Sequence, residues 1–254
     1  MPILVALLGL IVGALASHIA EAVMVKRPLA KPACPFCTTP YSPLQWLATL
    51  ALVAGQGRCR ACGKYFRWPR LIGELFTALS WGLIVGLNGL DLRVIFSMLV
   101  VIPLTMIMVT DLETKRVPNL IMLPAIALIF VIGTIFGPAL PSVTTWEWWY
   151  APAGGLLGFI VLRIFVTLGV AAFGPGALGE GDMTLATYAG AVVGFPLVII
   201  TLLLMIAFGG IGATGVIIAR KGSLKTAIPY GPFIILGCVT TMLWGPEILL
   251  WFLT

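Results

Sequence analysis

The chain has 254 residues and a formal net charge of +6, with 60% hydrophobic and only 9% charged residues. Because a soluble domain carries roughly 25% charged residues, this composition excludes a protein whose main solvent is water. The basic residues are clustered and are not interleaved with aromatic residues outside the apolar runs, which argues against nucleic acid as a partner. The lipid bilayer is the expected environment.

Membrane-spanning helices are predicted wherever about 20 apolar residues run without internal charges. One such region, 183–219, is too long for a single crossing. Gly194-Phe195-Pro196 is expected to divide it, because Pro lacks an N–H group and disfavours helix in the residue before it. The sequence therefore predicts an all-α polytopic membrane protein with about eight transmembrane helices. The regions are 3–25, 71–88, 92–110, 119–137, 151–173, 183–219 and 230–253.

The basic residues predict how these helices are oriented. If the loop 26–70 is cytoplasmic, eight crossings also place 111–118, 174–182 and 220–229 on the cytoplasmic side. These four segments hold every Lys and Arg except Arg93 and Arg163. Such a bias is the rule for cytoplasmic loops of membrane proteins. The first helix starts almost at Met1 without a basic segment or a cleavage site, so it is expected to be retained.

Four of the five cysteines lie in the first loop, as Cys34-Pro-Phe-Cys37 and Cys59-Arg-Ala-Cys62. Two residues between thiolates let each pair bind one tetrahedral metal, and two such pairs form a closed structural zinc site. Disulfides are the less favoured interpretation, because cytoplasmic thiols stay reduced. The sequence therefore predicts a small zinc-binding insertion whose metal supplies folding energy directly.

Two carboxylates, Asp111 and Asp182, are the candidates for chemistry. Asp111 follows an apolar run directly, and Asp182 precedes one in Gly179-Glu180-Gly181-Asp182. Taken singly, each could be a helix-end residue, with Asp182 as an N-cap. Eight crossings place both on the same face at the same depth, however, and the flexible glycines beside Asp182 allow close backbone approach to a ligand. Together they form a candidate catalytic pair.

Two carboxylates in one confined site share a proton, because both cannot ionise cheaply. The charged one can take a proton from water attacking a peptide carbonyl, while the protonated one donates to the oxyanion. A two-histidine zinc peptidase is excluded, since His18 is the only histidine. Glu113 and Glu180, which neighbour the two aspartates, could offer local negative potential for a basic substrate or could be solvated loop residues.

Gly179-Glu180-Gly181-Asp182 matches the GxGD signature of intramembrane aspartic proteases, and nearly the whole chain resembles the bacterial type IV prepilin peptidases. The four-cysteine loop distinguishes this resemblance from the shorter archaeal preflagellin peptidases. The residues that carry it are the paired cysteines, Arg67-Trp68-Pro69 leading to Glu74-Leu75, Asp111 with Val117-Pro118-Asn119, and Ile228-Pro229-Tyr230-Gly231-Pro232-Phe233.

The resemblance implies that Asp111 and Asp182 are catalytic and that the substrates are prepilins or pseudopilins of a pilus or secretion system. Cleavage would remove a short basic leader on the cytoplasmic side of the bacterial inner membrane. The family also methylates the new N-terminus with S-adenosylmethionine, an activity associated with the cysteine loop. This chain departs from the family pattern after the first helix, where it reads Gly13-Ala-Leu-Ala-Ser17-His18. Tyr230 is a candidate neighbour of the aspartates.

The expected organisation is a first transmembrane helix (1–25), a four-cysteine module (26–70) and a transmembrane aspartic peptidase domain (71–254). Two other functional classes remain open from the residues. One is an ion- or proton-coupled transporter, whose carboxylates should lie near the membrane midplane. The other is a non-catalytic scaffold of a secretion machine.

Overall fold

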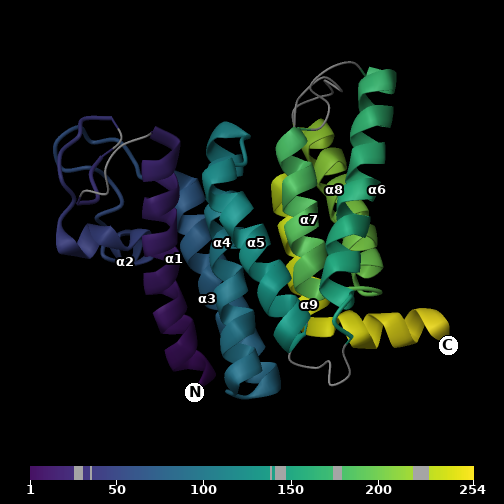
Figure 1. The fold of residues 1–254 in the computed structure, drawn as a ribbon. Helices are drawn as coiled ribbons and strands as arrows, with labels where there is room; N and C mark the ends of the chain where they lie inside the picture. Colours follow the sequence, from purple (N-terminus) through teal and green to yellow (C-terminus); the bar gives the residue numbers. More distant parts are fainter. Residues whose placement is uncertain (26–30, 35, 138, 141–146, 174–178, 220–228) are drawn as a thin grey trace.

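The computed structural model describes the whole chain except residues 26–30, 35, 138, 141–146, 174–178 and 220–228 (Figure 1). Its described part is almost entirely helical and contains two isolated β-bridges but no strand. The long helices are α1 (Pro2–Val25), α3 (Trp68–Asn88), α4 (Leu92–Thr114), α5 (Asn119–Phe136), α6 (Tyr150–Phe173), α7 (Glu180–Val193), α8 (Val198–Ala219) and α9 (Gly231–Leu253). The all-α prediction is confirmed.

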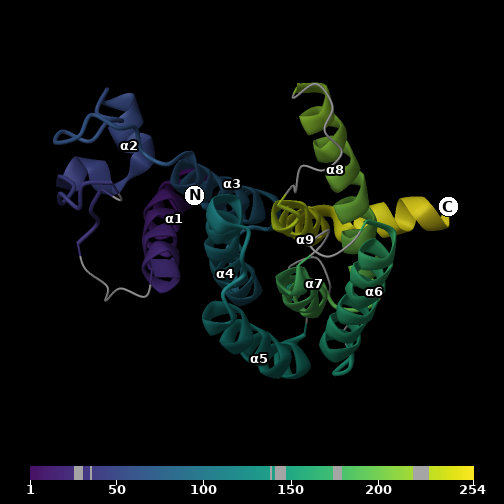
Figure 2. The same cartoon turned by 90° about the horizontal axis from the view of Figure 1, so that it is seen from above.

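The predicted crossings coincide with these helices, but one of them is short. Seven helices of the described residues are long and apolar enough to cross a membrane. Helix α7 has 14 residues, or about 21 Å of rise, against about 30 Å of hydrocarbon. Seen from above, it lies between α5, α6 and α9 (Figure 2). Most of its side chains are buried, so α7 is an inner helix of the bundle.

The division of the long apolar region occurs where it was predicted. Helix α7 ends at Val193 and is followed by Gly194, whose positive φ of 73° suits a residue without a Cβ atom, and α8 begins at Val198 after Pro196. Helix α4 begins at Leu92, and the preceding residue Asp91 caps it by accepting a 2.7 Å hydrogen bond from the Val94 N–H.

Small residues let two pairs of helices pack with their backbones almost touching. A Cβ atom on Gly13 of α1 would lie 2.9 Å from the Glu74 backbone of α3. On α6, Gly154 and Gly158 face the carbonyls of Gly190 and Ala186 on α7, and Cβ atoms there would lie 2.3 and 2.4 Å from them. Such small-residue contacts are a common way to pack helices in lipid.

The elements that carry the candidate residues gather at one end of the bundle. In Figure 1 the cysteine module, the end of α4 and the start of α7 lie at the upper end, whereas both termini lie at the lower end. The last part of α9, which contains Pro246, runs across this lower end. Of the basic residues used to predict orientation, Lys26, Arg27, Arg220, Lys221 and Lys225 lie outside the described residues.

Candidate active site and metal centre

Asp111 lies in the last turn of α4, which continues to Thr114 rather than ending at the aspartate. Only 4% of its surface is exposed. Its Oδ2 atom accepts a 3.0 Å hydrogen bond from the backbone N–H of Gly231, the first residue of α9. The start of α9 therefore fixes the orientation of this carboxyl group.

Asp182 is held in the same way by a different glycine. Helix α7 begins at Glu180, three residues earlier than an N-cap role for Asp182 requires. The Oδ2 atom of Asp182 instead reaches back and accepts a 3.0 Å hydrogen bond from the Gly179 N–H. The residue is 7% exposed. The helix-end interpretation is thus partly right, because Asp182 does satisfy a backbone donor at the helix start.

The two carboxyl groups belong to one site. They are close enough for the charge of Asp182 to act on Asp111. A contact beside them explains the second glycine of the GxGD sequence, because a Cβ atom on Gly181 would lie 2.7 Å from Cβ of Val117. The segment after α4 and the start of α7 can meet this closely only because Gly181 has no side chain.

Tyr230 stands at the edge of this site, immediately before α9. Burial raises the pKa of its phenol, and the negative charge of Asp182 raises it further, so the phenol is neutral at physiological pH. Its ring packs against Gly209 of α8, where a Cβ atom would lie 2.9 Å from the ring. The structure therefore brings Tyr230 to the aspartates, as the sequence suggested.

The two neighbouring glutamates have different environments. Glu113 forms an ion pair with Arg67, with 3.3 Å between Oε2 and Nη1, and its side chain is only 9% exposed. Glu180, at the start of α7, is exposed. The charge of Glu180 is therefore open to solvent, whereas the charge of Glu113 is already compensated within the protein.

The four loop cysteines form one cluster. Their sulfur atoms all lie within 4.8 Å of one another, with 3.7 Å between Cys34 and Cys62 and 3.5 Å between Cys37 and Cys59. Four sulfurs bound to zinc at about 2.3 Å would be about 3.8 Å apart, so the spacing fits a tetrahedral site. Hydrogen bonding to Thr39 lowers the pKa of Cys37 to about 6, which favours the thiolate that a metal requires.

Each cysteine pair is shaped by a similar turn. The N–H of Cys34 donates to the carbonyl of Thr39 and the N–H of Cys59 to that of Lys64, at 2.9 and 2.8 Å. Two residues in these turns, Thr38 and Gly63, have left-handed backbone conformations, with φ of 58° and 69°. The two halves of the cluster are thus built alike and hold four free thiols that could bind a metal.

Glu74 attaches the module to the bundle, a role that the sequence did not identify. Its carboxylate accepts hydrogen bonds from the N–H groups of Ala48 and Thr49 at 2.7 and 2.8 Å, at the start of the short helix α2 (Ala48–Val53). Arg70 also forms an ion pair with this carboxylate, with 3.8 Å between Nε and Oε1. The sequence signal for this role was a carboxylate one turn inside an apolar helix. Burial of such a charge is costly unless a partner compensates it, so a partner was to be expected.

Removal of the metal is expected to loosen the cysteine module. The wild type should purify with one zinc ion per chain, and Cys34→Ser should lose it and make residues 31–67 more sensitive to protease. Cys238→Ala is the control, since Cys238 is buried in α9. Elemental analysis and limited proteolysis measure both effects. A wild type without zinc, together with unchanged protease resistance in Cys34→Ser, would refute the zinc assignment.

Comparisons with known proteins agree on one family. The model of the type IV leader peptidase family matches residues 98–214, and that of the bacterial peptidase A24 N-terminal domain matches 7–87. Three similar proteins are prepilin leader peptidase/N-methyltransferases. The one from Bacillus subtilis is 25% identical over 85% of this chain and 82% of its own. Those from Aeromonas hydrophila and Pseudomonas aeruginosa are 28% and 27% identical, each over 87% of this chain and 74% and 73% of their own. No solved structure matches the chain.

Proposed function

Because the chain belongs to the type IV leader peptidase family, we propose that it cleaves the short basic leader from type IV prepilins or pseudopilins at the cytoplasmic face of the bacterial inner membrane. Asp111 and Asp182 are the catalytic residues of this proposal. The observation that carries it is the meeting of two buried carboxyl groups, each held by a glycine N–H, at one end of a membrane bundle.

The proposed chemistry uses the pair as a single acid and base. A proton shared between the two carboxyl groups leaves one charged and one neutral. The charged carboxylate takes a proton from water as the oxygen attacks the scissile carbonyl, and the neutral carboxyl donates to the developing oxyanion. The Gly231 and Gly179 amides occupy Oδ2 of each group, which leaves each Oδ1 for the shared proton, water or substrate.

The substrate is proposed to approach from the side of the bundle, with its apolar helix in lipid and its leader at the membrane edge. A peptide bond must be unwound before it can be cut, and unwound backbone within the hydrocarbon must be buried in protein or face water. A site at the end of the bundle meets this need. Exposed Glu180 offers the basic leader a negative charge beside Asp182.

Methylation of the new N-terminus is proposed as a second activity, because the similar proteins carry both activities in their names. The methyl group would come from S-adenosylmethionine. The sequence carries no glycine-rich strand-turn-helix fingerprint of a nucleotide site, so no residue is assigned to this donor. In the proposed organisation, the module 26–70 serves this second activity and 71–254 performs the cleavage, while 1–25 is the first transmembrane helix.

The proposal is tested with purified protein, a synthetic prepilin and radiolabelled S-adenosylmethionine. We expect a product shortened by the leader, followed by label at its new N-terminus. Shortened product without label would remove the methyltransferase assignment and leave the peptidase intact. Intact substrate, with wild-type protein that retains its helical content, would contradict the peptidase. The position of the aspartates already disfavours a transporter, whose carboxylates should lie near the midplane.

A further inference from the structure

Arg163 is a cation on an apolar helix, and within the described residues its side chain has no carboxylate partner. It lies inside α6 and its side chain is exposed among exposed apolar neighbours, including Ile160 and Ile164. All nine Asp and Glu residues of the chain fall within the described residues, and none of them forms an ion pair with Arg163. A carboxylate partner for Arg163 is therefore absent from the described residues.

The packing of α6 on α7 fixes the height of Arg163 in the bundle. The two helices run antiparallel, with Gly154 against the carbonyl of Gly190 and Gly158 against that of Ala186. One more step of four residues on each helix brings residue 162 opposite Asp182. Arg163 is thus level with the catalytic end of the bundle, although it lies in the middle of its own helix. If Asp182 is at the membrane edge, Arg163 is at the depth of the lipid headgroups.

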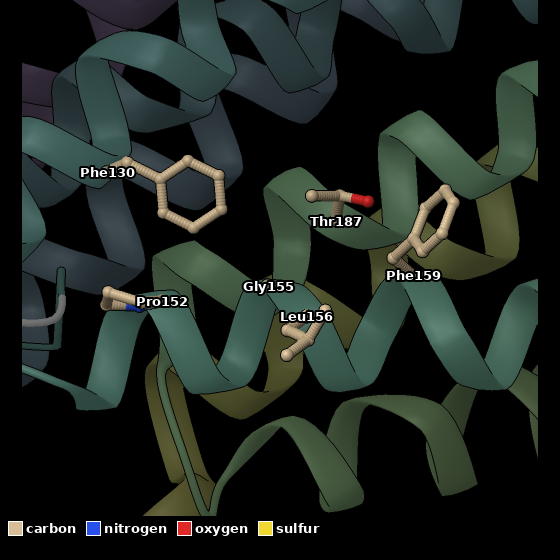
Figure 3. Close-up of a pocket in the computed structure, with 6 residues that line it drawn as sticks. All are labelled: Phe130, Pro152, Gly155, Leu156, Phe159 and Thr187. Atoms are coloured by element: carbon tan, nitrogen blue, oxygen red, sulfur yellow. The ribbon is translucent and has the colours of Figure 1, made fainter.

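An apolar groove begins one turn away from Arg163 on the same face of α6. It has a volume of about 420 Å³ and lies between α5, α6 and α7. Figure 3 shows the rings of Phe130 and Phe159 on either side of Thr187. The Thr187 hydroxyl already donates a 2.8 Å hydrogen bond to the Met183 carbonyl, so it needs no polar partner from a ligand in the groove. The residues that line it are Phe130, Pro152, Gly155, Leu156, Phe159 and Thr187.

The groove and the cation form one continuous stripe. Residues 152, 155, 156, 159 and 163 recur at helical spacing, which puts them on one face of α6. The stripe runs away from the catalytic end over 11 residues, or about 16 Å of helix. One molecule with an anionic head and an apolar tail could therefore contact both Arg163 and the groove.

We propose that this face of α6 is a binding site for a phospholipid. The Arg163 guanidinium donates hydrogen bonds to the phosphate, and one acyl chain lies in the groove between Phe130 and Phe159. Arg is always charged and its planar donors suit phosphate oxygens. An unpaired charge at membrane depth is costly unless it reaches the interface, and a bound headgroup removes that cost.

The proposal is tested by titrating the purified protein with dioleoyl-phosphatidylglycerol and counting bound lipids by native mass spectrometry. Arg163→Leu should weaken binding about fivefold, the factor for one basic residue at an anionic membrane surface. Arg163→Lys should restore most of it. The control is Arg60→Leu, because Arg60 is exposed in the module and donates a hydrogen bond to Gln56 there.

Two further titrations separate a lipid from free phosphate. Inorganic phosphate and glycerol phosphate should not displace the lipid at equal concentration, because neither fills the groove. Displacement by either would show an anion site without a lipid site and would overturn the proposal. Equal lipid binding by wild type, Arg163→Leu and Arg60→Leu would overturn it as well.

Discussion

Asp111→Asn and Asp182→Asn should each lower kcat for leader cleavage by at least about 1,000-fold, the range that one positioned acid or base contributes. Asn keeps the shape of Asp, and its carbonyl oxygen can still accept the hydrogen bond from Gly231 or Gly179. The substitution therefore removes the exchangeable proton and the charge while it keeps the local packing. The measurement is steady-state cleavage of a synthetic prepilin in detergent.

The control for these variants is Asp91→Asn, at the other end of the bundle, where the side chain caps α4. Asn is as good an N-cap as Asp, so this variant should fold and cleave normally. Thermal unfolding of all three variants should match the wild type within a few degrees. Full turnover by either catalytic variant would show that the residue does no chemistry.

Gly231→Ala is expected to lower kcat about 100-fold with little change in KM. A Cβ atom at this position would lie 2.6 Å from Oδ2 of Asp111, so the carboxyl group must move. A displacement of about 1 Å in a catalytic group costs about that factor. The measurement is the same cleavage assay, with kcat and KM determined separately.

A matched control for this variant is available in α8. Gly210 has nothing within 4 Å of an added Cβ atom, so Gly210→Ala should keep wild-type kcat. If Gly231→Ala cleaves as well as Gly210→Ala, the backbone of α9 does not position Asp111.

Local sequence signals predicted the helices well because hydropathy and helix breakers act over short distances. Gly194-Phe195-Pro196 divided the long apolar run as expected. The length of α7 was harder to predict, because 183–219 is apolar throughout and hydropathy alone does not show that α7 is an inner helix. The four cysteines were grouped from spacing alone, since two CxxC pairs leave few other geometries.

Contacts between distant segments could not be predicted. The hydrogen bond from Gly231 to Asp111 joins residues 120 positions apart, and the sequence Pro229-Tyr230-Gly231-Pro232 does not show which distant residue it contacts. The height of Arg163 in the bundle could not be predicted either, because it depends on how α6 packs on the shorter α7. The hydrogen bonds from Ala48 and Thr49 to Glu74 likewise join residues about 25 positions apart, and no local signal shows them.

The central claim is that Asp111 and Asp182 act as one unit, and the double variant Asp111→Asn/Asp182→Asn tests it most directly. When two residues act as one catalytic unit, removing either one already abolishes the contribution of both. The double variant should therefore cleave a synthetic prepilin no more slowly than the slower single variant. Independent roles would instead multiply the two losses. A double variant slower than either single variant by a further factor of about 1,000 would contradict a shared catalytic pair.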